Sequence, residues 1–513
     1  MSRNSASISK NWNDDNKRTR DSEVMSDGSE MPEDAAAGAG NVQDDDDFVV
    51  AATVMEKIKE IVFSVMFFMV HGNSSWPAFE YGSMLIEDLQ LVTFFISPDL
   101  MDAYTIPYNL AYSQMEYQTM DLNQFNIWFI LCVCAVFVLI LNIIWVAYGF
   151  LSGQHKFIWP IWTLRFSAMV LPTVLYLPIL EIIVNPITCN RILDTEVHHS
   201  RRSDIFALEY IPCNSPLRLP QLIVAVIALV VYIPTCISFA AVFFDTKPTC
   251  KEPSNRVHGR LDIIYACVKT CLIFVYKFLP HQQDLARVVS ATLGCVIMFL
   301  TTVTYFPYYN PFINQMRAGL FFGASVVGVV GTIATAIHAA TGVQGSILYI
   351  YIMAGGYPLG ILMGFVISGL ILKSIERGVR RRLKKLQSGE GVDDFSQPEL
   401  LVFHSWVQVE IAARFSTVHM DHRRQRINFA VIPEVQAIFK RGIEEFPDQP
   451  LLRLSYALYM FHLKSMTRDA THQLSKIDQL NPPLDVKFQI YYTNQIATTV
   501  KETDFLVKAS NWI

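Results

Sequence analysis

The sequence predicts an all-α protein: a polytopic transmembrane helical bundle of about eight spans, followed by a cytoplasmic domain of tetratricopeptide-like helical repeats. Three observations predict this class. Of the 513 residues, 52% are hydrophobic and 17% are charged, and the mean hydropathy is +0.30. The apolar residues gather in long uncharged runs, and the C-terminal part has the periodicity of amphipathic helices. Because soluble domains carry about a quarter charged residues, this composition favours lipid as the solvent.

Seven segments are long and apolar enough to cross about 30 Å of hydrocarbon as helices, which takes roughly 18 residues or more. Four of them contain no charged residue: 127–150, Gln221–Phe244, Val288–Tyr309 and Val343–Leu372. The other three contain few charged residues or none: Pro160–Val184, Leu261–Leu279 and Ala318–Ala340. A soluble protein with very long buried helices is the alternative, but its helices would not need such uncharged length.

An eighth span is predicted at Ile58–Val70, extended backward to Phe48, although two Lys and two Glu residues lie inside the longer segment. The segment can instead lie flat in the interface, which leaves seven spans. Lys and Arg gather on the cytoplasmic flanks of membrane spans. Seven of them lie between Lys373 and Lys385, after the last span, whereas residues 71–125 contain none. We therefore expect eight spans, both termini in the cytoplasm, and the plasma membrane as the location.

The chain is expected to divide into five regions. Residues 1–47 are polar and acidic, which is typical of a disordered cytoplasmic tail. The other four are a first span with outer interfacial helices at 48–125, a seven-span bundle at 126–373, a basic juxtamembrane linker at 374–396 and a cytoplasmic helical domain at 397–513.

The predicted outer side carries three features. In the outer segment 76–120, Ser83–Ser97 mixes apolar and acidic residues, which predicts one or two helices that lie on the outer surface and cap the bundle, or a ligand-binding cap. Cys189 and Cys213 are the two cysteines of the long outer loop 185–219, where they can pair as a disulfide or stay as two free thiols. Asn73 begins a glycosylation sequon, a weak signal because it lies close to the predicted first span.

Small residues recur every four positions along the last two predicted spans. They are Ala324, Gly328, Thr332, Ala336 and Ala340 on the first helix, and Gly356, Gly360 and Gly364 on the second. This spacing places them on one face of each helix, where the lack of bulky side chains lets two backbones approach closely. Because a short loop joins the two helices, we expect close antiparallel packing. A gate or a sliding interface is the alternative.

Three charged residues lie inside predicted spans. Lys269 lies near the middle of its span, where a charge exposed to lipid costs several kcal/mol, so it should face the bundle interior. An internal salt bridge or hydrogen bond is expected for it, and a pathway or ligand role is the alternative. Glu181 and Lys277 lie at similar depth near the outer ends of their spans, so they can pair or reach the interface separately.

The C-terminal region is predicted to contain five amphipathic helices: Pro398–Thr417, Ile432–Phe446, Pro450–Lys464, Asp469–Leu480 and Leu484–Val500. At an offset of 34 residues, Leu452 corresponds to Val486 and Leu454 to Phe488. This period belongs to tetratricopeptide-type repeats, which bind partners on a concave surface. We therefore expect a cytoplasmic protein partner for residues 397–513, with an ordinary helical bundle as the alternative fold.

The sequence contains no recognisable motif for catalysis, cofactor binding or metal ligation. There is no Walker loop, HExxH, CxxC pair, kinase signature or nucleophile elbow. The histidine pair His198-His199 lacks the ligand framework of a zinc site. We therefore expect no enzymatic activity, no cofactor and no nucleic-acid partner. The lipid bilayer is an expected partner, and a homo-oligomer stays open.

The C-terminal motifs also carry a family resemblance. After the basic stretch RGVRRRLKK come VEIAARF, IFKRGIEEFPDQPLLRLSYALYMF and LNPPLDVKFQIYY. Residues 405–495, which contain these last three segments, resemble the tiny macrocysts B/C-like (TmcB/TmcC) multi-pass membrane proteins of protists, and the acidic tail and bundle match them by arrangement. Longer relatives continue into further spans, PAS modules and sometimes a nucleotide cyclase domain. The resemblance therefore implies membrane sensing or signalling, by a short form or by a piece of a longer receptor.

The leading hypothesis is a non-enzymatic membrane receptor or scaffold that couples the bundle to a cytoplasmic repeat surface. One rival is the membrane-anchoring N-terminal half of a PAS/nucleotide-cyclase receptor. The other rival is a channel or transporter, which Lys269 and the glycine stripe motivate.

Overall fold

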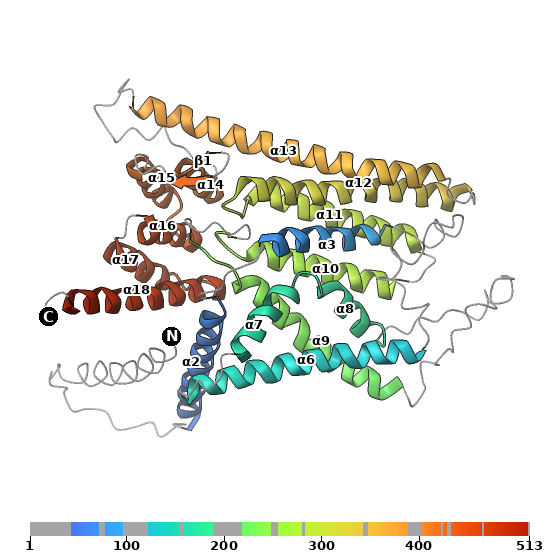
Figure 1. The fold of residues 1–513 in the computed structure, drawn as a ribbon, viewed down its shortest axis with the longest axis horizontal. Coiled ribbons are helices and arrows are strands. Elements are labelled where there is room, and N and C mark those ends of the chain that lie inside the picture. The colour runs from blue at the N-terminus through green and yellow to red at the C-terminus, as the bar shows by residue number, and fades with distance from the viewer. Residues whose placement is uncertain are drawn as a thin grey trace, which may run out of the picture. The chain divides into compact units, whose positions relative to one another are not determined.

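The computed structural model describes most of the helical parts of the chain, with the elements labelled in Figure 1. The described ranges are 43–70, 77–95, 122–152, 159–187, 218–247, 255–279, 283–341, 347–387, 403, 405–421, 424–427, 432–463 and 466–510. The chain divides into two compact units, residues 1–73 with 138–167, and residues 74–137 with 168–513.

Helix α2 (Gln43–Val70) belongs to the smaller unit. It begins at Gln43, so Asp44–Asp47 are helical and do not belong to the disordered tail expected over 1–47. Acidic residues are favoured at a helix N-terminus, where the helix dipole presents partial positive charge, which explains the earlier start. In the same unit, the Arg165 guanidinium donates to the Phe68 carbonyl at 2.7 Å.

Five helices within the described ranges are long and apolar enough to cross a membrane. They are α6 (Leu122–Leu151), α9 (Arg218–Val242), α11 (Asp284–Tyr305), α12 (Pro311–Thr341) and α13 (Ile347–Gln387). Their outward faces expose large apolar side chains, for example Leu141 at 64% and Val230 at 65%. Such faces are unfavourable in water and favourable in hydrocarbon.

The remaining two of the seven predicted apolar spans are not among these five helices. Pro160–Val184 is divided into α7 (Trp159–Val170) and α8 (Tyr176–Val184) by a turn. Pro172 lies in that turn and has no backbone N–H to continue the helix, which explains the break. Helix α10 (Arg260–Phe278) corresponds to the expected span at Leu261–Leu279.

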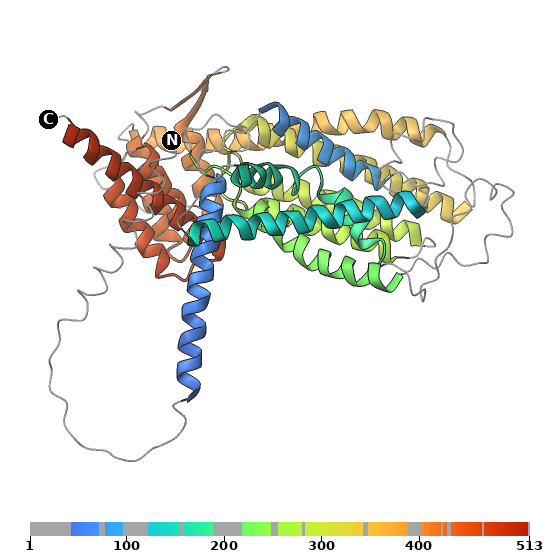
Figure 2. The ribbon, with the colours of Figure 1, turned by 60° about the horizontal axis from the view of Figure 1, so that its bottom comes forward.

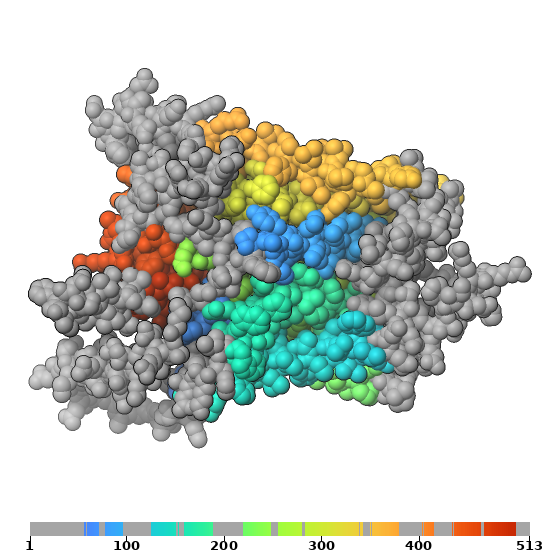
Figure 3. All heavy atoms as spheres, in the orientation of Figure 1, coloured from blue at the N-terminus to red at the C-terminus, as the bar shows by residue number. Residues whose placement is uncertain are grey.

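Helix α3 (Pro77–Thr93) corrects the expectation for Ser83–Ser97. That segment was expected on the outer surface, but α3 packs lengthwise on α12 inside the larger unit (Figures 1 and 2). Asp88 and Leu91 are 1% and 0% exposed, so the inner face of α3 is buried in the core of this unit. Its outer face is visible in Figure 3 as a blue strip next to the yellow and orange atoms of α12 and α13.

Helices α12 and α13 make the closest helix pair. A Cβ atom added to Gly360 would lie 2.9 Å from the Gly323 Cα, and one added to Gly364 would lie 3.0 Å from the Gly319 Cα. The α13 glycines therefore do permit close backbone approach. Their partners are Gly319 and Gly323, which the expected α12 stripe did not include.

The α12 stripe that includes Ala324 instead faces other helices. Gly328 lies against Phe95 and Thr292, and the Thr332 hydroxyl lies 3.3 Å from the Thr292 hydroxyl of α11. Ala324 is fully buried, Ala336 is half-buried and Ala340 is exposed. The reason is geometric: Gly323 precedes Ala324 by one residue, so it lies about 100° away around the helix axis, on a different face of α12.

Helix α13 extends beyond the end of the predicted bundle region, residue 373. It continues to Gln387, so the first part of the expected linker 374–396 is helical. The following α14 (Trp406–Thr417) ends in a hairpin of β1 (Val418–Asp421) and β2 (Arg424–Ile427), with Val418 opposite Ile427. This short hairpin is a departure from the expected all-α fold.

The remaining helices are α15 (Ile432–Glu445), α16 (Pro450–Leu463), α17 (Thr467–Asp478) and α18 (Leu484–Ser510). They lie close to the predicted ranges, and they pack with α14 around two adjoining apolar clusters. Leu452 and Val486, which the 34-residue offset relates, are both 0% exposed. Leu454 and Phe488, the second related pair, are 2% and 1% exposed.

Candidate functional site

The polar face of α3 points into the larger unit. Glu80, Ser83, Glu87 and Gln90, spaced by three or four residues, are all under 8% exposed, whereas Leu89 on the other face is 46% exposed. A helix in water buries its apolar face, but a helix in lipid is expected to turn its polar face inward. The burial pattern of α3 therefore fits hydrocarbon as its outer solvent.

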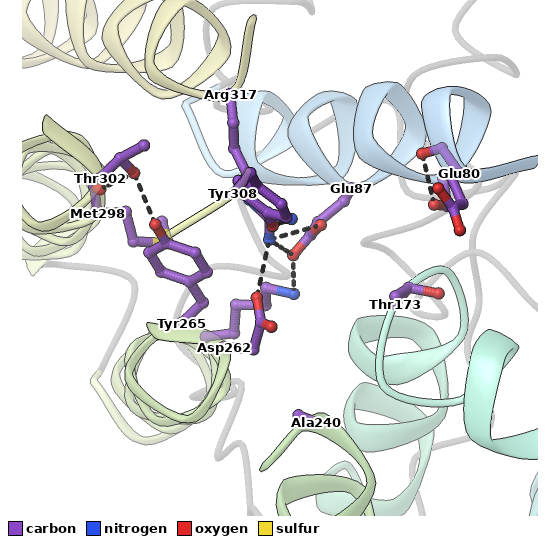
Figure 4. Close-up of polar contacts among 12 residues, drawn as sticks. Glu80, Glu87, Thr173, Ala240, Asp262, Tyr265, Met298, Thr302, Tyr308 and Arg317 are labelled. Atoms are coloured by element: carbon purple, nitrogen blue, oxygen red, sulfur yellow. Dashed lines mark hydrogen bonds and ion pairs between the residues drawn. The ribbon is translucent and has the colours of Figure 1, made fainter. Parts of the chain in front are cut away.

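Glu87 lies between two cations from other helices, Lys269 and Arg317, and Figure 4 shows its contact with Arg317. Its carboxylate forms an ion pair with Lys269 of α10, and lies 3.3 Å from the Arg317 guanidinium of α12. The side chains of Glu87 and Lys269 are 5% and 2% exposed. Removing such charges from water costs several kcal/mol each, so each depends on its oppositely charged neighbour.

The ion pairs continue toward the start of α10. Arg317 also lies 3.6 Å from Asp262, and Asp262 pairs in turn with Arg256. Signs alternate along this series, which we call the ionic network: Lys269, Glu87, Arg317, Asp262 and Arg256. Alternation places attraction between every adjacent pair in a medium of low polarity, where like charges would repel strongly.

Aromatic rings surround Arg317. Its guanidinium carbon lies 4.8 Å from the centre of the Tyr265 ring, 5.6 Å from that of Phe321 and 5.8 Å from that of Tyr308. The rings favour a cation by their electron-rich faces while excluding water. The Arg317 Nη1 donates to the Tyr308 hydroxyl at 2.6 Å, which fixes the direction of the guanidinium.

Tyr308 connects the ionic network to the C-terminal helices. While its hydroxyl accepts from Arg317, its backbone carbonyl accepts from Arg414 Nη1 of α14 at 2.7 Å. Arg414 Nη2 lies 2.9 Å from Glu410 on the previous turn of α14. Burial raises the pKa of Glu410, and the charge of Arg414 counteracts that rise.

The loop that carries Tyr308 has a constrained backbone. Phe306 ends α11 with a φ of 42°, a left-handed conformation that costs a non-glycine residue about 1 kcal/mol or more. Its ring is fully buried and packs with Leu372 of α13 and Ile411 of α14. The packing thus holds the loop in place between the bundle and α14.

A second polar link lies nearby. The Arg260 guanidinium at the start of α10 lies 2.8 Å from the carboxylate of Asp485 in α18. The adjacent His258 is buried, and burial lowers its pKa to about 4, with smaller contributions from Arg414 and Arg260. His258 is therefore neutral at physiological pH.

The intramembrane charges expected from the sequence all have partners. The Lys277 ammonium lies 3.0 Å from the Glu181 carboxylate, and Lys269 pairs with Glu87. Cys189, Cys213 and Asn73, the disulfide and glycosylation candidates, lie outside the described residues. No group of three or more His, Cys, Asp or Glu residues in the described part could hold a metal ion.

Sequence reasoning missed most of the ionic network. Glu87 was placed on the outer surface, and Arg256, Asp262 and Arg317 lie near the ends of predicted spans, where charge is ordinary. The available signal was the spacing of Glu80, Glu87 and Gln90, which marks one polar stripe on a helix whose other face is apolar.

Long apolar helices around an ionic interior define the chain as a helical membrane protein. It is similar to two curated proteins of Dictyostelium discoideum: Tiny macrocysts protein B, 21% identical over 481 residues, and Tiny macrocysts protein C, 20% identical over 514 residues. The two matches confirm the resemblance to the TmcB/TmcC-like proteins. The matches cover 86% and 88% of this chain but 33% and 35% of those proteins, so it spans about a third of their length. No protein-family model and no solved structure matches the chain.

Proposed function

We propose that this protein is a non-enzymatic, multi-pass membrane receptor or scaffold in signalling, in which the helical bundle is coupled to a cytoplasmic protein-binding domain, α14–α18. The observation that carries the proposal is the position of Tyr308. One side chain from the bundle, Arg317, and one from α14, Arg414, hydrogen-bond to the same residue. A shift of α12 that moves Arg317 would therefore be transmitted to α14.

The energies of these two hydrogen bonds support coupling between the bundle and α14. A hydrogen bond from a charged donor contributes roughly 1.5–3 kcal/mol, and these two lie in a buried setting where loss of one leaves a charge unsatisfied. Two alternative arrangements of such a network differ in free energy by enough to shift the equilibrium between two conformations of the protein. Such a shift is required for a signal to pass between two sites.

The partner-binding part of the proposal rests on α15–α18. Corresponding positions of the 34-residue period, Leu452 with Val486 and Leu454 with Phe488, occupy equivalent buried places. Equivalent burial is what two stacked helix–turn–helix repeats require. We propose that α14 supplies the first layer of a tetratricopeptide-like stack, and that the stack binds a cytoplasmic protein.

We propose eight membrane helices, one of which differs from the set expected from the sequence. Helix α3 replaces the segment 48–70, since α3 packs among the bundle helices with its charges inward. The Pro77 end of α3 is near the α11–α12 loop, because Tyr81 stacks edge-on with Phe312. Cysteines introduced at Ala78, which is exposed in the first turn of α3, and at Asn310 should therefore react with an impermeant thiol reagent from the same side, the cytoplasmic side. Labelling from opposite sides would contradict this arrangement.

The coupling is tested by removing one oxygen. The change Tyr308→Phe deletes the hydroxyl that accepts from Arg317 and keeps the carbonyl that accepts from Arg414. In the full chain in nanodiscs, amide hydrogen exchange of α14 should rise by about tenfold, since about 1.4 kcal/mol of local stability is lost.

A matched control is Tyr176→Phe. Tyr176 is also fully buried, and its hydroxyl lies 2.6 Å from that of Thr270, in the bundle alone. This variant should leave the exchange of α14 unchanged. Equal exchange of α14 in the wild type and Tyr308→Phe, or an equal rise in both variants, would sink the coupling proposal.

The buried polar face of α3 favours a second candidate function, a channel or transporter. Glu87, Asp88 and Lys269 lie buried in the interior of the bundle. Ion or solute flux through reconstituted full-length protein, reduced by Lys269→Ala, would support that function. Absence of flux in both the wild type and the variant would remove it.

The lengths of the relatives favour a third candidate, the membrane part of a longer receptor. The chain spans about a third of each Tiny macrocysts protein. Sequencing the transcript beyond the codon for Ile513 tests this. An in-frame extension that encodes a PAS or cyclase region would support it, and an immediate stop codon would exclude it.

A further inference from the structure

Helix α13 is about twice as long as a membrane crossing requires. It has 41 residues, or roughly 60 Å at 1.5 Å per residue, against about 30 Å of hydrocarbon. Its membrane-compatible part is Tyr351–Gly378, so the helix continues without interruption for about nine residues beyond that part. The extension is thus held by the membrane helix itself.

Basic residues follow one side of α13 from the end of its membrane-compatible part into this extension. Lys373, Arg377, Arg380 and Lys384, spaced by four, three and four residues, lie within about 60° of one another around the helix axis. We call these four residues the basic line. Lys373 and Arg377, whose exposure the structure describes, are both exposed. Arg381, Arg382 and Lys385 add to the charge of the same two turns, and Glu376 is the one acidic residue between Lys373 and Lys385.

The opposite side of α13 is occupied. Leu372 is 7% exposed and packs with Phe306 and Ile411, and Ile375 joins the same cluster. The exposed residues Lys373 and Arg377 therefore lie on the side of α13 away from this cluster.

From these positions we propose that the basic line of α13 binds the anionic lipid headgroups of the membrane that the helix crosses. Lys384 is about six residues, or roughly 9 Å, beyond Gly378, so the line lies within about one Debye length of the bilayer surface. A basic residue near an anionic bilayer surface contributes about 1 kcal/mol of attraction. Because the same helix packs on α14, lipid composition at this surface acts on the α14–α18 side of the protein.

Lipid binding by the basic line differs from a role of the same residues in directing membrane insertion. Positive charge that only directs insertion has no effect after folding, whereas a lipid site selects anionic lipid in the finished membrane protein. Lipid selectivity of the purified, reconstituted protein therefore distinguishes the two.

The test uses the full chain in phosphatidylcholine vesicles with trace amounts of spin-labelled lipid. The motionally restricted fraction of spin-labelled phosphatidylserine is compared with that of spin-labelled phosphatidylcholine. We expect the wild type to prefer phosphatidylserine by about threefold, and the preference to decrease as NaCl is raised to about 1 M. The triple variant Lys373→Gln, Arg377→Gln, Arg380→Gln should lose most of it.

A matched control removes the same charge elsewhere. Lys440, Arg468 and Lys476 are exposed bases of α15 and α17, and changing all three to Gln should leave the lipid preference at its wild-type value. Thermal unfolding of both variants shows whether each is folded. A preference that survives in the α13 variant, that falls equally in the control, or that is missing from the wild type would overturn the proposal.

Discussion

Glu87 and Arg317, 230 positions apart in the chain, lie with their charged atoms 3.3 Å apart in the interior of the larger unit. Glu87 also pairs with Lys269, and Arg317 also contacts Asp262 and Tyr308. This contact joins α3, α10 and α12, so three segments that are distant in the sequence depend on one carboxylate. Its removal should therefore have consequences well beyond α3.

The change Glu87→Gln should destabilise the protein strongly. It leaves Lys269 and Arg317 as buried cations without the carboxylate between them, and breaking a buried ion pair costs about 3–5 kcal/mol. Thermal unfolding in detergent should show a large decrease in Tm.

The double variant Glu87→Gln, Lys269→Met separates electrostatics from packing. It removes one cation together with the carboxylate, while Arg317 keeps its contact with Asp262. The double variant should therefore be more stable than Glu87→Gln alone, with a coupling free energy of about 1–3 kcal/mol. Strict additivity of the two single changes would contradict the ion pair.

The glycines of α13 give a test of helix packing. A Cβ atom at Gly364 would lie 3.0 Å from the carbonyl oxygen of Ala318, so Gly364→Ala should cost about 1–3 kcal/mol through forced separation of the two helices. At Gly355 an added Cβ meets nothing within 4 Å, and Gly355→Ala should be neutral or stabilising because Ala is the better helix former. Unfolding temperatures of the two variants check the contrast.

Much of the helical architecture was accessible from the sequence, because long uncharged segments have few other stable solutions in lipid. The expected spans at Gln221–Phe244 and Val288–Tyr309 lie within three residues of α9 and four of α11 at each end. The C-terminal helices were similarly clear from periodicity and from prolines such as Pro450.

The ionic network could not be predicted, for a physical reason. A helix with one polar and one apolar face can lie on a membrane surface or inside a bundle, and the sequence of α3 fits both. The presence of Lys269 and Arg317 on other helices, as partners for Glu87, decides between these two positions of α3. These tertiary contacts cannot be recognised from the local sequence of α3. The α12 face toward α13 was missed because Gly319 and Gly323 precede the more regular stripe that begins at Ala324.

The two links between the bundle and the C-terminal helices should differ in strength and in salt dependence. Arg260, with a side chain 38% exposed, contributes at most about 1 kcal/mol through Asp485, and Arg260→Ala should matter less at high salt. The Arg414 side chain is 3% exposed, and the change Arg414→Met leaves the buried Glu410 without its cation. Exchange of α14 should therefore rise strongly in Arg414→Met at every salt concentration. Equal, salt-sensitive effects of both variants would show that the Arg414 link is exposed to solvent.

The environment of His258 predicts a loss of stability in acid. Its pKa is about 4 in the folded protein, because burial opposes the charged form, and 6.5 for the unperturbed side chain. The unfolded state therefore binds the proton first as the pH falls, so the contribution is complete above about pH 6.5 and is lost progressively down to about pH 4. Between about pH 7 and about pH 5 the loss amounts to about 2 kcal/mol.

The matched variant is His258→Asn, which removes the titration and keeps a polar side chain of similar size next to Arg414 and Arg260. Its stability at neutral pH can differ from that of the wild type, but its pH dependence across this interval should be flatter by the same 2 kcal/mol or so. Thermal unfolding at matched pH values measures both slopes. His462, whose pKa burial also lowers to about 4, remains in the variant and sets the residual slope. Parallel slopes in the wild type and the variant would mean that His258 has the same pKa in the folded and the unfolded protein, and that solvent reaches the contact between α14 and the bundle.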